Sequence, residues 1–257
     1  MSETNRPQAE EAERIVPPYS LSALLYDRLV GQYAFEHWRE NFERLRNRYA
    51  LDISRVADAA CGTGMAARFL AGQGSEVYAC DLSLEMLRAA EASCGRMVEL
   101  ARQDMRYLSP PRKVNLIVCA TDSLNHLLRE EDIRRAFYSF HAALLQGGCA
   151  LFDLNTTWQL REGADDKPWE FEIDGFPLRW VSGWDEGSKT ATLSFIFPPR
   201  EPGGRSVMEL HRERAYEAEW LVRELKEAGF RDVEVLDAAG LGEVHESTRR
   251  LQFVAHA

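Results

Sequence analysis

Two aspartates, Asp58 and Asp81, each end a short apolar run, and a loop of small residues follows the first of them. The loop contains Gly62 and Gly64, which let the chain turn sharply and let a ligand approach the backbone without an intervening Cβ atom. The helix predicted over residues 65–71 offers unpaired N–H groups at its start. Asp81, at the end of the second run, can accept both hydroxyls of a ribose. The segment therefore indicates binding of a nucleoside-like cofactor.

Two cofactors are compatible with the glycine loop. Residues 62–67 (GTGMAA) fit the G-x-G-x-x-A form of the dinucleotide fingerprint, and Asp81 lies about where a ribose-binding acid is expected. On these residues alone NAD stays open. Asp58 discriminates, because a carboxylate at the entrance of the loop would repel a pyrophosphate and attract the ammonium group of a methionine moiety.

Residues 58–64 (DAACGTG) closely resemble the first motif of the class I S-adenosylmethionine-dependent methyltransferases, in which an acid stands two residues before a glycine-rich loop. Ala60 departs from the pattern, since the general motif has its first glycine there, but a small residue still fits. This resemblance implies S-adenosylmethionine as the cofactor and covers nearly the whole chain.

The predicted elements agree with that family. The fold class is α/β, a doubly wound, mostly parallel seven-stranded sheet of the Rossmann-like type, with its last strand reversed. We expect residues 1–18 to be a mobile tail and residues 19–50 to form N-terminal helices that cap the cofactor. The cofactor-binding core is predicted to span residues 51–157 and 215–257. Between them, alternating segments in residues 158–214 predict an inserted antiparallel sheet of about four strands.

The inserted sheet is predicted to cover the substrate pocket. Four tryptophans fall in or just before it, namely Trp158, Trp169, Trp180 and Trp184. They would give the sheet an apolar face, either to pack on the core or to form a roof over the substrate.

The residues expected to contact the cofactor lie mostly at the ends of predicted strands. Tyr26 belongs to a segment similar to "YS…YD" in one group of small-molecule methyltransferases, where it folds over the cofactor. By the same resemblance an acid at Asp104 meets the adenine amino group and its apolar neighbour packs on the ring. The full set of cofactor-binding residues is Tyr26, Asp58, Ala60, Gly62, Gly64, Asp81, Leu82, Met86, Asp104, Met105 and Thr121.

Methyl transfer to an amine or a hydroxyl also requires an acceptor for the proton that the nucleophile loses. The candidates are His126, His211 and Asp122, with Tyr19, Tyr26 or Tyr216 as orienting hydroxyls. Residues 122–127 (DSLNHL) resemble "DSxNYL" of the same group, and residues 152–156 (FDLNT) resemble its "FDxNT". An ordinary role in a helix or at its N-cap stays open for His126 and Asp122.

Composition limits the partners. The 257 residues carry 41 acids and 31 bases, a net charge of −10, and only four of the bases are lysines, so nucleic acid is a poor partner. Carboxylates at the ends of predicted strands (Asp58, Asp81, Asp122 and Asp153) are expected to make the cleft negative. Such a cleft suits a small, partly apolar molecule, with an amine slightly favoured. The six histidines show no ligand spacing, so no metal is expected. The five cysteines lack C-x-x-C spacing and read as reduced thiols, and without a signal-like start or a long apolar run we expect a soluble, cytoplasmic protein.

Two other functions stay open at this level. An NAD(P)-dependent oxidoreductase of the short-chain type would need a tyrosine four residues before a lysine, and the four lysines have Ser109, Gly163, Asp185 and Val222 there. A protein that binds S-adenosylmethionine without catalysis is the second. The substrate, the choice between nitrogen and oxygen as acceptor, and the oligomeric state are left undetermined.

Overall fold

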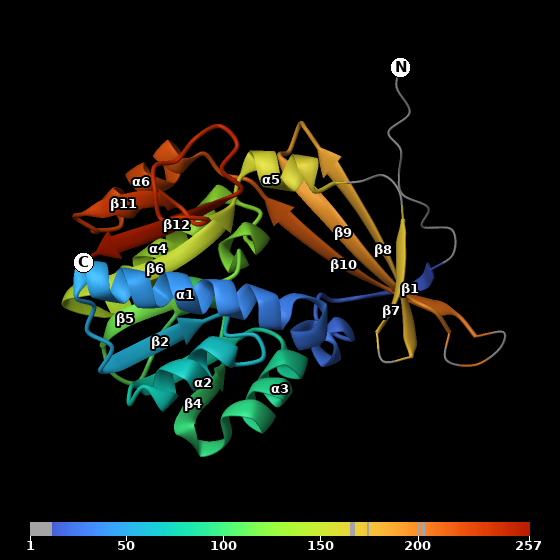
Figure 1. Ribbon diagram of the computed structural model, residues 1–257, viewed down its shortest axis with the longest axis horizontal. Helices are drawn as coiled ribbons and strands as arrows, with labels where there is room; N and C mark the ends of the chain where they lie inside the picture. The colour runs from blue at the N-terminus through green and yellow to red at the C-terminus, as the bar shows by residue number, and fades with distance from the viewer. Residues whose placement is uncertain (1–11, 165–167, 174, 200, 202–203) are drawn as a thin grey trace.

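The computed structural model describes residues 12–164, 168–173, 175–199, 201 and 204–257, which form two β-sheets with flanking helices (Figure 1). The larger sheet has seven strands in the order β11-β12-β6-β5-β2-β3-β4. Their bounds are β2 (Arg55–Ala59), β3 (Glu76–Asp81), β4 (Val98–Arg102), β5 (Val114–Cys119), β6 (Leu144–Asn155), β11 (Val233–Asp237) and β12 (Arg250–His256).

Strands β4, β3, β2, β5 and β6 pair in parallel, whereas β12 is antiparallel to both β6 and β11. The predicted seven-stranded, mostly parallel sheet with a reversed last strand is therefore confirmed. The strand order changes direction between β2 and β5, and ligands of open α/β sheets bind beyond the carboxyl ends of the strands at such a point.

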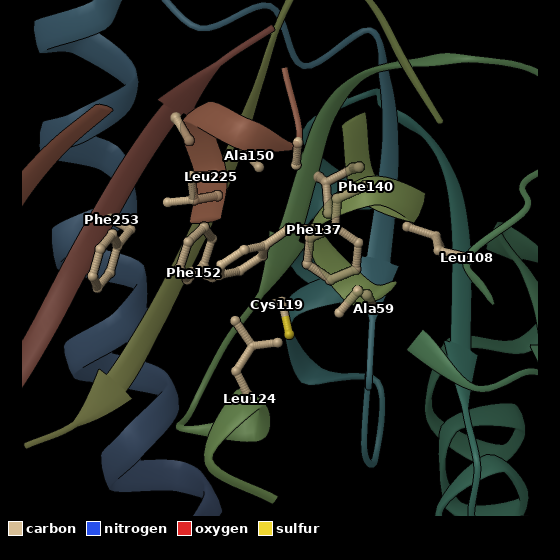
Figure 2. Packing of buried hydrophobic residues seen from close by; sticks show 14 of the residues in the cluster. Ala59, Leu108, Cys119, Leu124, Phe137, Phe140, Ala150, Phe152, Leu225 and Phe253 are labelled. Atoms are coloured by element: carbon tan, nitrogen blue, oxygen red, sulfur yellow. The ribbon is translucent and has the colours of Figure 1, made fainter. Parts of the chain in front are cut away.

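Helices cover both faces of this sheet (Figure 1). On one face, α1 (Gln32–Tyr49) and α2 (Met65–Gly72) bury Phe42 and Leu70 against the strands. On the other, α4 (Glu130–Ala143) and α6 (Ala218–Glu227) form a second cluster. There the rings of Phe152 and Phe253 stack with centroids 4.8 Å apart, with Phe137 beside them (Figure 2). Each fully buried Phe contributes about 1.5–3 kcal/mol, so these clusters fix the strand ends that carry the site.

The second sheet stands beside the core and has five strands in the order β1-β10-β9-β8-β7 (Figure 1). Four of its strands pair with one another in antiparallel fashion, namely β7 (Trp169–Ile173), β8 (Phe176–Asp185), β9 (Thr190–Phe197) and β10 (Ser206–Arg214). These are the four antiparallel strands expected from the sequence, preceded by the short helix α5 (Thr157–Glu162).

The fifth strand corrects the predicted tail. Residues 1–11 lie outside the described residues, but Ala12–Val16 form β1, which pairs in parallel with β10. The sequence did not show this, because the partner strand lies almost 200 residues away and β-pairing depends on such tertiary context. Of the helices predicted over residues 19–50, α1 forms as a regular α-helix. The earlier part instead forms a 3₁₀ turn, η2 (Ser22–Leu24), and a π-helical turn, η3 (Asp27–Gly31).

Two further findings concern the described residues as a whole. All five cysteines are free and buried, as expected for structural thiols. Within the described ranges, no helix has the length and apolar character needed to cross a membrane.

Candidate active site

A cavity of about 1050 Å³ opens at the carboxyl ends of β2, β3 and β5. Ligand pockets span about 300–1,000 Å³, so this one has room for a cofactor and an acceptor together. Its walls come from residues 15–20 and Tyr26, from helix α1, from the loops after β2, β3, β4 and β5, and from Leu210 and Arg212 of β10.

Ten of the eleven residues predicted to contact the cofactor line this cavity. They are Tyr26, Asp58, Ala60, Gly62, Asp81, Leu82, Met86, Asp104, Met105 and Thr121. Gly64 has another task. It caps helix α2 with φ +80°, and a Cβ atom there would lie 2.6 Å from the sulfur of Cys94. Gly64 thus permits close packing of α2 on α3 (Leu84–Cys94), while Gly62, with φ +55° and no neighbour within 4 Å of an added Cβ, faces open space.

Asp58 presents an unsatisfied carboxylate to the cavity. Its side chain is buried, and its Oδ2 atom has no hydrogen-bond partner among the described residues. Burial, and then the charge of Asp81, raise the pKa of Asp58 to about 7, against the lowering effect of the Ala67 N–H. A buried carboxylate oxygen without a partner is costly. The site therefore favours a cationic or hydrogen-donating ligand at this point.

Asp81 is already oriented by the backbone. Its Oδ2 accepts from the Gly62 N–H at 2.9 Å, and its Oδ1 accepts from the Ser83 N–H at 2.9 Å. Burial raises the pKa of Asp81, although these hydrogen bonds oppose the shift. Each carboxylate oxygen keeps a lone pair for a ligand hydroxyl. Next to it, Ser83 caps α3 by accepting from the Met86 N–H at 3.2 Å.

Asp104 lies at the other end of the cavity and is held by Arg106. The Arg106 Nε atom donates to both oxygens at 3.0 Å, and its Nη1 also pairs with Asp132 at 3.0 Å. Burial alone would raise the pKa of Asp104, but the hydrogen bonds and charge of Arg106 lower it overall. Asp104 therefore stays an ionised acceptor, with Met105 beside it as an apolar surface.

Tyr19 and His126 form a hydrogen-bonded pair on the cavity wall. The Tyr19 hydroxyl lies 3.0 Å from His126 Nε2, and His126 Nδ1 lies 3.2 Å from the carbonyl oxygen of Arg212. Because a carbonyl only accepts, Nδ1 carries the proton and Nε2 accepts from Tyr19. Burial, and to a lesser degree His211, lower the pKa of His126, while Asp122 and the Arg212 hydrogen bond oppose the shift. His126 is thus a neutral base at physiological pH.

The other two candidate bases point elsewhere. His211 is buried, and its Nε2 lies 2.9 Å from Glu209 Oε1. Asp122 pairs with Arg250 at 3.0 Å and accepts from the Asn155 amide at 2.8 Å. Neither residue is among those that line the cavity. Of the three, only His126 is placed where a substrate proton could reach it.

Asp122 instead belongs to a strained turn after β5. Thr121 and Asp122 have φ values of 55° and 53°, which a β-branched residue rarely adopts. Asp153 holds the turn, because its Oδ2 accepts from the Thr121 N–H at 3.1 Å and its Oδ1 from the Asp122 N–H at 2.5 Å. Arg250 pairs with both aspartates. Sequence reasoning missed Arg250, since no local pattern relates it to a turn 128 residues earlier.

The N-terminal segment lines part of the cavity and contacts the glycine loop that follows β2. The Thr63 hydroxyl donates to Asp27 Oδ1 at 2.6 Å. Burial raises the pKa of Tyr26 to about 12, although the side chain of Thr121 opposes the shift. From the second sheet, by contrast, Leu210 and Arg212 reach the cavity lining, and none of the four tryptophans near or within that sheet does so among the described residues.

Comparisons with known proteins agree with this geometry. Residues 56–148 match a family model described as "Methyltransferase domain". The chain is 30% identical over 217 residues to "Putative methyltransferase YqeM" of Bacillus subtilis (strain 168), covering 82% of this chain and 86% of that protein. It is 27% identical over 212 residues to dTDP-3-amino-3,6-dideoxy-alpha-D-glucopyranose N,N-dimethyltransferase of Streptomyces fradiae, covering 82% and 74%.

Among solved structures, the fold is similar to an S-adenosylmethionine-dependent methyltransferase from Clostridium acetobutylicum ATCC 824. The TM-score is 0.78 at 26% identity, and the match covers 93% of this chain and 98% of the other.

Proposed function

The chain belongs to the class I S-adenosylmethionine-dependent methyltransferases, and we propose that it transfers a methyl group to nitrogen or oxygen of a small molecule, with an amine as the favoured acceptor. The observation that carries the proposal is the Tyr19–His126 pair on the wall of a cavity large enough for both reactants. The family assignment also leaves the oxidoreductase alternative without support.

S-adenosylmethionine is the cofactor of this family, and the cavity residues fit it. The unpartnered oxygen of Asp58 suits the ammonium group of the methionine moiety, and the oriented carboxylate of Asp81 suits the two ribose hydroxyls. Asp104 can accept from the adenine amino group while Met86 and Met105 pack against the ring. When bound, the cofactor supplies an electrophilic methyl group on a positively charged sulfur.

The protein's own task is then positioning and proton removal. Holding the acceptor about 3 Å from the methyl carbon can supply roughly 7–11 kcal/mol of the barrier. A protonated amine must first lose a proton to expose its lone pair. We assign this to a relay: Tyr19 passes its hydroxyl proton to His126 Nε2 and takes the acceptor's proton in its place. Burial keeps the pKa of Tyr19 well above its ordinary value, so the residue is a hydroxyl before and after the transfer.

An amine is favoured for two reasons. The carboxylates of Asp58 and Asp81 give the cavity a negative lining that attracts cations. Several relatives are also named for transfer to nitrogen, among them the Streptomyces fradiae dimethyltransferase and the glycine/sarcosine N-methyltransferase of Aphanothece halophytica, which is 27% identical over 185 residues. The net charge of −10 argues against nucleic acid as the acceptor. With five free, buried cysteines, we place the enzyme in the cytoplasm.

The test is a methyl-transfer assay with labelled S-adenosylmethionine against a panel of amino sugars, amino acids, other amines and alcohols. Product mass and fragmentation identify the methylated atom. Transfer to a tRNA or a protein, with none across the panel, would contradict the small-molecule assignment. Tight cofactor binding without turnover on any acceptor would favour the non-catalytic alternative.

Asp81→Ala is expected to weaken S-adenosylmethionine binding by about 1.5–3 kcal/mol, the scale of a hydrogen bond to a charged group. Calorimetric titration measures this, and NAD serves as the ligand that should bind poorly to both proteins. Glu91→Ala, which removes an exposed carboxylate from helix α3, is the matched control and should bind as the wild type does. An unchanged affinity in Asp81→Ala would show that the ribose is held elsewhere.

Cofactor binding is also expected to slow amide exchange in residues 19–31. This segment contributes Tyr19, Ser20 and Tyr26 to the cavity wall, so a bound ligand should suppress its opening. Hydrogen exchange followed by mass spectrometry measures the effect, with strands β8 and β9 as the internal reference. Protection confined to residues 58–81 would mean that the segment does not close on the cofactor.

A further inference from the structure

Glu209 of strand β10 is fully buried and collects an unusual number of donors. Its Oε1 atom accepts from the Tyr19 N–H at 2.9 Å and from His211 Nε2 at 2.9 Å. Its Oε2 atom accepts from the Leu21 N–H at 2.6 Å and the Ser22 N–H at 3.0 Å. The Ser22 hydroxyl donates to Oε1 as well. Burial alone would raise the pKa of Glu209, but these hydrogen bonds lower it overall, so the group is a carboxylate.

The positions of these donors indicate that the carboxylate orders residues 19–22. A carboxylate has about four lone-pair sites, so five donors saturate it and repay the cost of burying its charge. Four of the five come from residues 19–22, three of them from main-chain N–H groups. The carboxylate of Glu209 therefore accepts the hydrogen bonds that backbone carbonyl groups would accept if residues 19–22 were part of a helix. It holds Tyr19 in a left-handed conformation, φ 62°, that a tyrosine rarely adopts.

We propose that Glu209 is a positioning residue of the methyl-transfer reaction, which fixes residues 19–22 on strand β10 so that the Tyr19 hydroxyl meets His126. The proposal rests on the proposed function, because it gives Tyr19 a place in proton removal. Two other residues of strand β10 also position this pair. The ring of His211 packs edge-on against Tyr19 with centroids 4.7 Å apart, and the Arg212 carbonyl accepts a hydrogen bond from His126.

The N-terminal segment has a second, separate attachment. The hydrogen bond from the Thr63 hydroxyl to Asp27 holds its later part against the glycine loop that follows β2. Tyr26 also interacts with the side chain of Thr121, in the turn after β5. Within the described part of this segment, Glu209 forms its hydrogen bonds with Tyr19, Leu21 and Ser22. Loss of Glu209 should therefore disturb the proton relay at Tyr19 and leave the contacts nearest the cofactor in place.

Glu209→Gln is the direct test, because it keeps the shape of the side chain while an amide NH₂ group then faces main-chain donors. We expect kcat to fall about 10–100-fold, the scale of an ångström-sized misplacement of a reacting group, with S-adenosylmethionine affinity unchanged by calorimetry. In a Tyr19→Phe background the same substitution should cost little further activity, since the hydroxyl that Glu209 positions is already absent.

Amide exchange supplies an independent readout. In Glu209→Gln the amides of Tyr19, Leu21 and Ser22 should exchange faster, whereas those of β12 should not. Ser22→Ala removes one donor and leaves the carboxylate, so it should show a smaller change in the same direction and serves if Glu209→Gln does not fold. Glu172→Gln, an exposed carboxylate on strand β7 of the same sheet, is the matched control and should behave as the wild type.

The outcomes separate the two proposals. Equal losses of kcat from Glu209→Gln in the wild-type and Tyr19→Phe backgrounds, or unchanged exchange of residues 19–22 in both test variants, would overturn the positioning role. A normal kcat in Tyr19→Phe alone would overturn the relay instead, and with it the catalytic consequence of Glu209. Faster exchange would then still show that Glu209 anchors the segment.

Discussion

Replacing His126 by asparagine is expected to lower kcat by about 10²–10⁴-fold, the range for loss of a general base. Asparagine can still donate to the Arg212 carbonyl from the position of Nδ1, so the local fold should persist. It has no acceptor at the position of Nε2, 3.0 Å from the Tyr19 hydroxyl. The proton relay therefore loses its end point while the cavity keeps its shape. Steady-state kinetics with saturating cofactor measures the effect.

The pH profile of the wild type tests the same assignment. His126 must be neutral to accept a proton, and its pKa is lowered from the ordinary value of 6.5 by burial. Activity that depends on His126 should thus be retained at pH 6.5 and be lost only as the pH falls through this lower pKa. An amine acceptor adds a second requirement, since its own ammonium form becomes harder to deprotonate as the pH falls. In His126→Asn the loss of activity at low pH that is caused by protonation of the histidine should disappear from the pH profile.

His245→Asn is the control for a histidine removed from the surface. His245 is 59% exposed and pairs with Asp237 at 2.9 Å, away from the cavity. It should leave kcat and the pH profile unchanged. A His126→Asn enzyme with wild-type kcat would show that proton removal occurs elsewhere, for example by loss of the proton to solvent before the amine binds.

Much of the fold could be predicted from the sequence because the signals are local. The glycine loop after Asp58 and the alternating segments within residues 158–214 each depend on a few adjacent residues. The resemblance to the methyltransferase family then indicated a mostly parallel seven-stranded sheet with its last strand reversed. The seven-stranded sheet, the family and S-adenosylmethionine as cofactor are confirmed.

The long-range features could not be predicted in this way. Strand β1 forms on β10, and Glu209 replaces helical hydrogen bonding in residues 19–22, so neither leaves a local pattern. His211 and Asp122 have side chains suited to catalysis, but only the folded chain shows which partners engage them. Glu209, two residues away on the same strand, binds His211, and Arg250, distant in the sequence, pairs with Asp122. Residue type indicates what a side chain can do, and tertiary contacts determine where it points.

The same principle gives the largest expected effect on stability. Arg250 lies among Asp122, Asp153 and Glu213, and its Nη1 atom is 3.0 Å from Asp122 Oδ1 and 3.1 Å from Asp153 Oδ1. Burial, and then Asp122, raise the pKa of Glu213 to about 8, so this carboxyl is largely protonated and accepts the Asn155 amide at 3.0 Å. The guanidinium thus balances the two aspartates that form the turn at residues 121–122. Among the described residues, no other cationic side chain forms an ion pair with Asp122 or Asp153.

Arg250→Met is therefore expected to lower the free energy of unfolding by about 2–4 kcal/mol. Breaking a fully buried ion pair costs about 3–5 kcal/mol, and the value is reduced here because the Arg250 side chain is 30% exposed. The melting temperature should fall by several degrees. Cofactor binding should weaken as well, because Thr121 lines the cavity and its left-handed conformation depends on Asp153.

The pH dependence identifies the cause. Without Arg250 the nearby carboxyls lose the charge that favours their ionised forms. The pKa of Asp153, already raised by burial, should rise further. The deficit of Arg250→Met relative to the wild type should then be largest near neutral pH and shrink as the pH falls and these groups take up protons. Arg88→Met, which breaks an exposed pair 3.4 Å from Glu85, should cost at most about 1 kcal/mol and show no such trend. A deficit independent of pH would mean that Arg250 stabilises the turn by packing rather than by its charge.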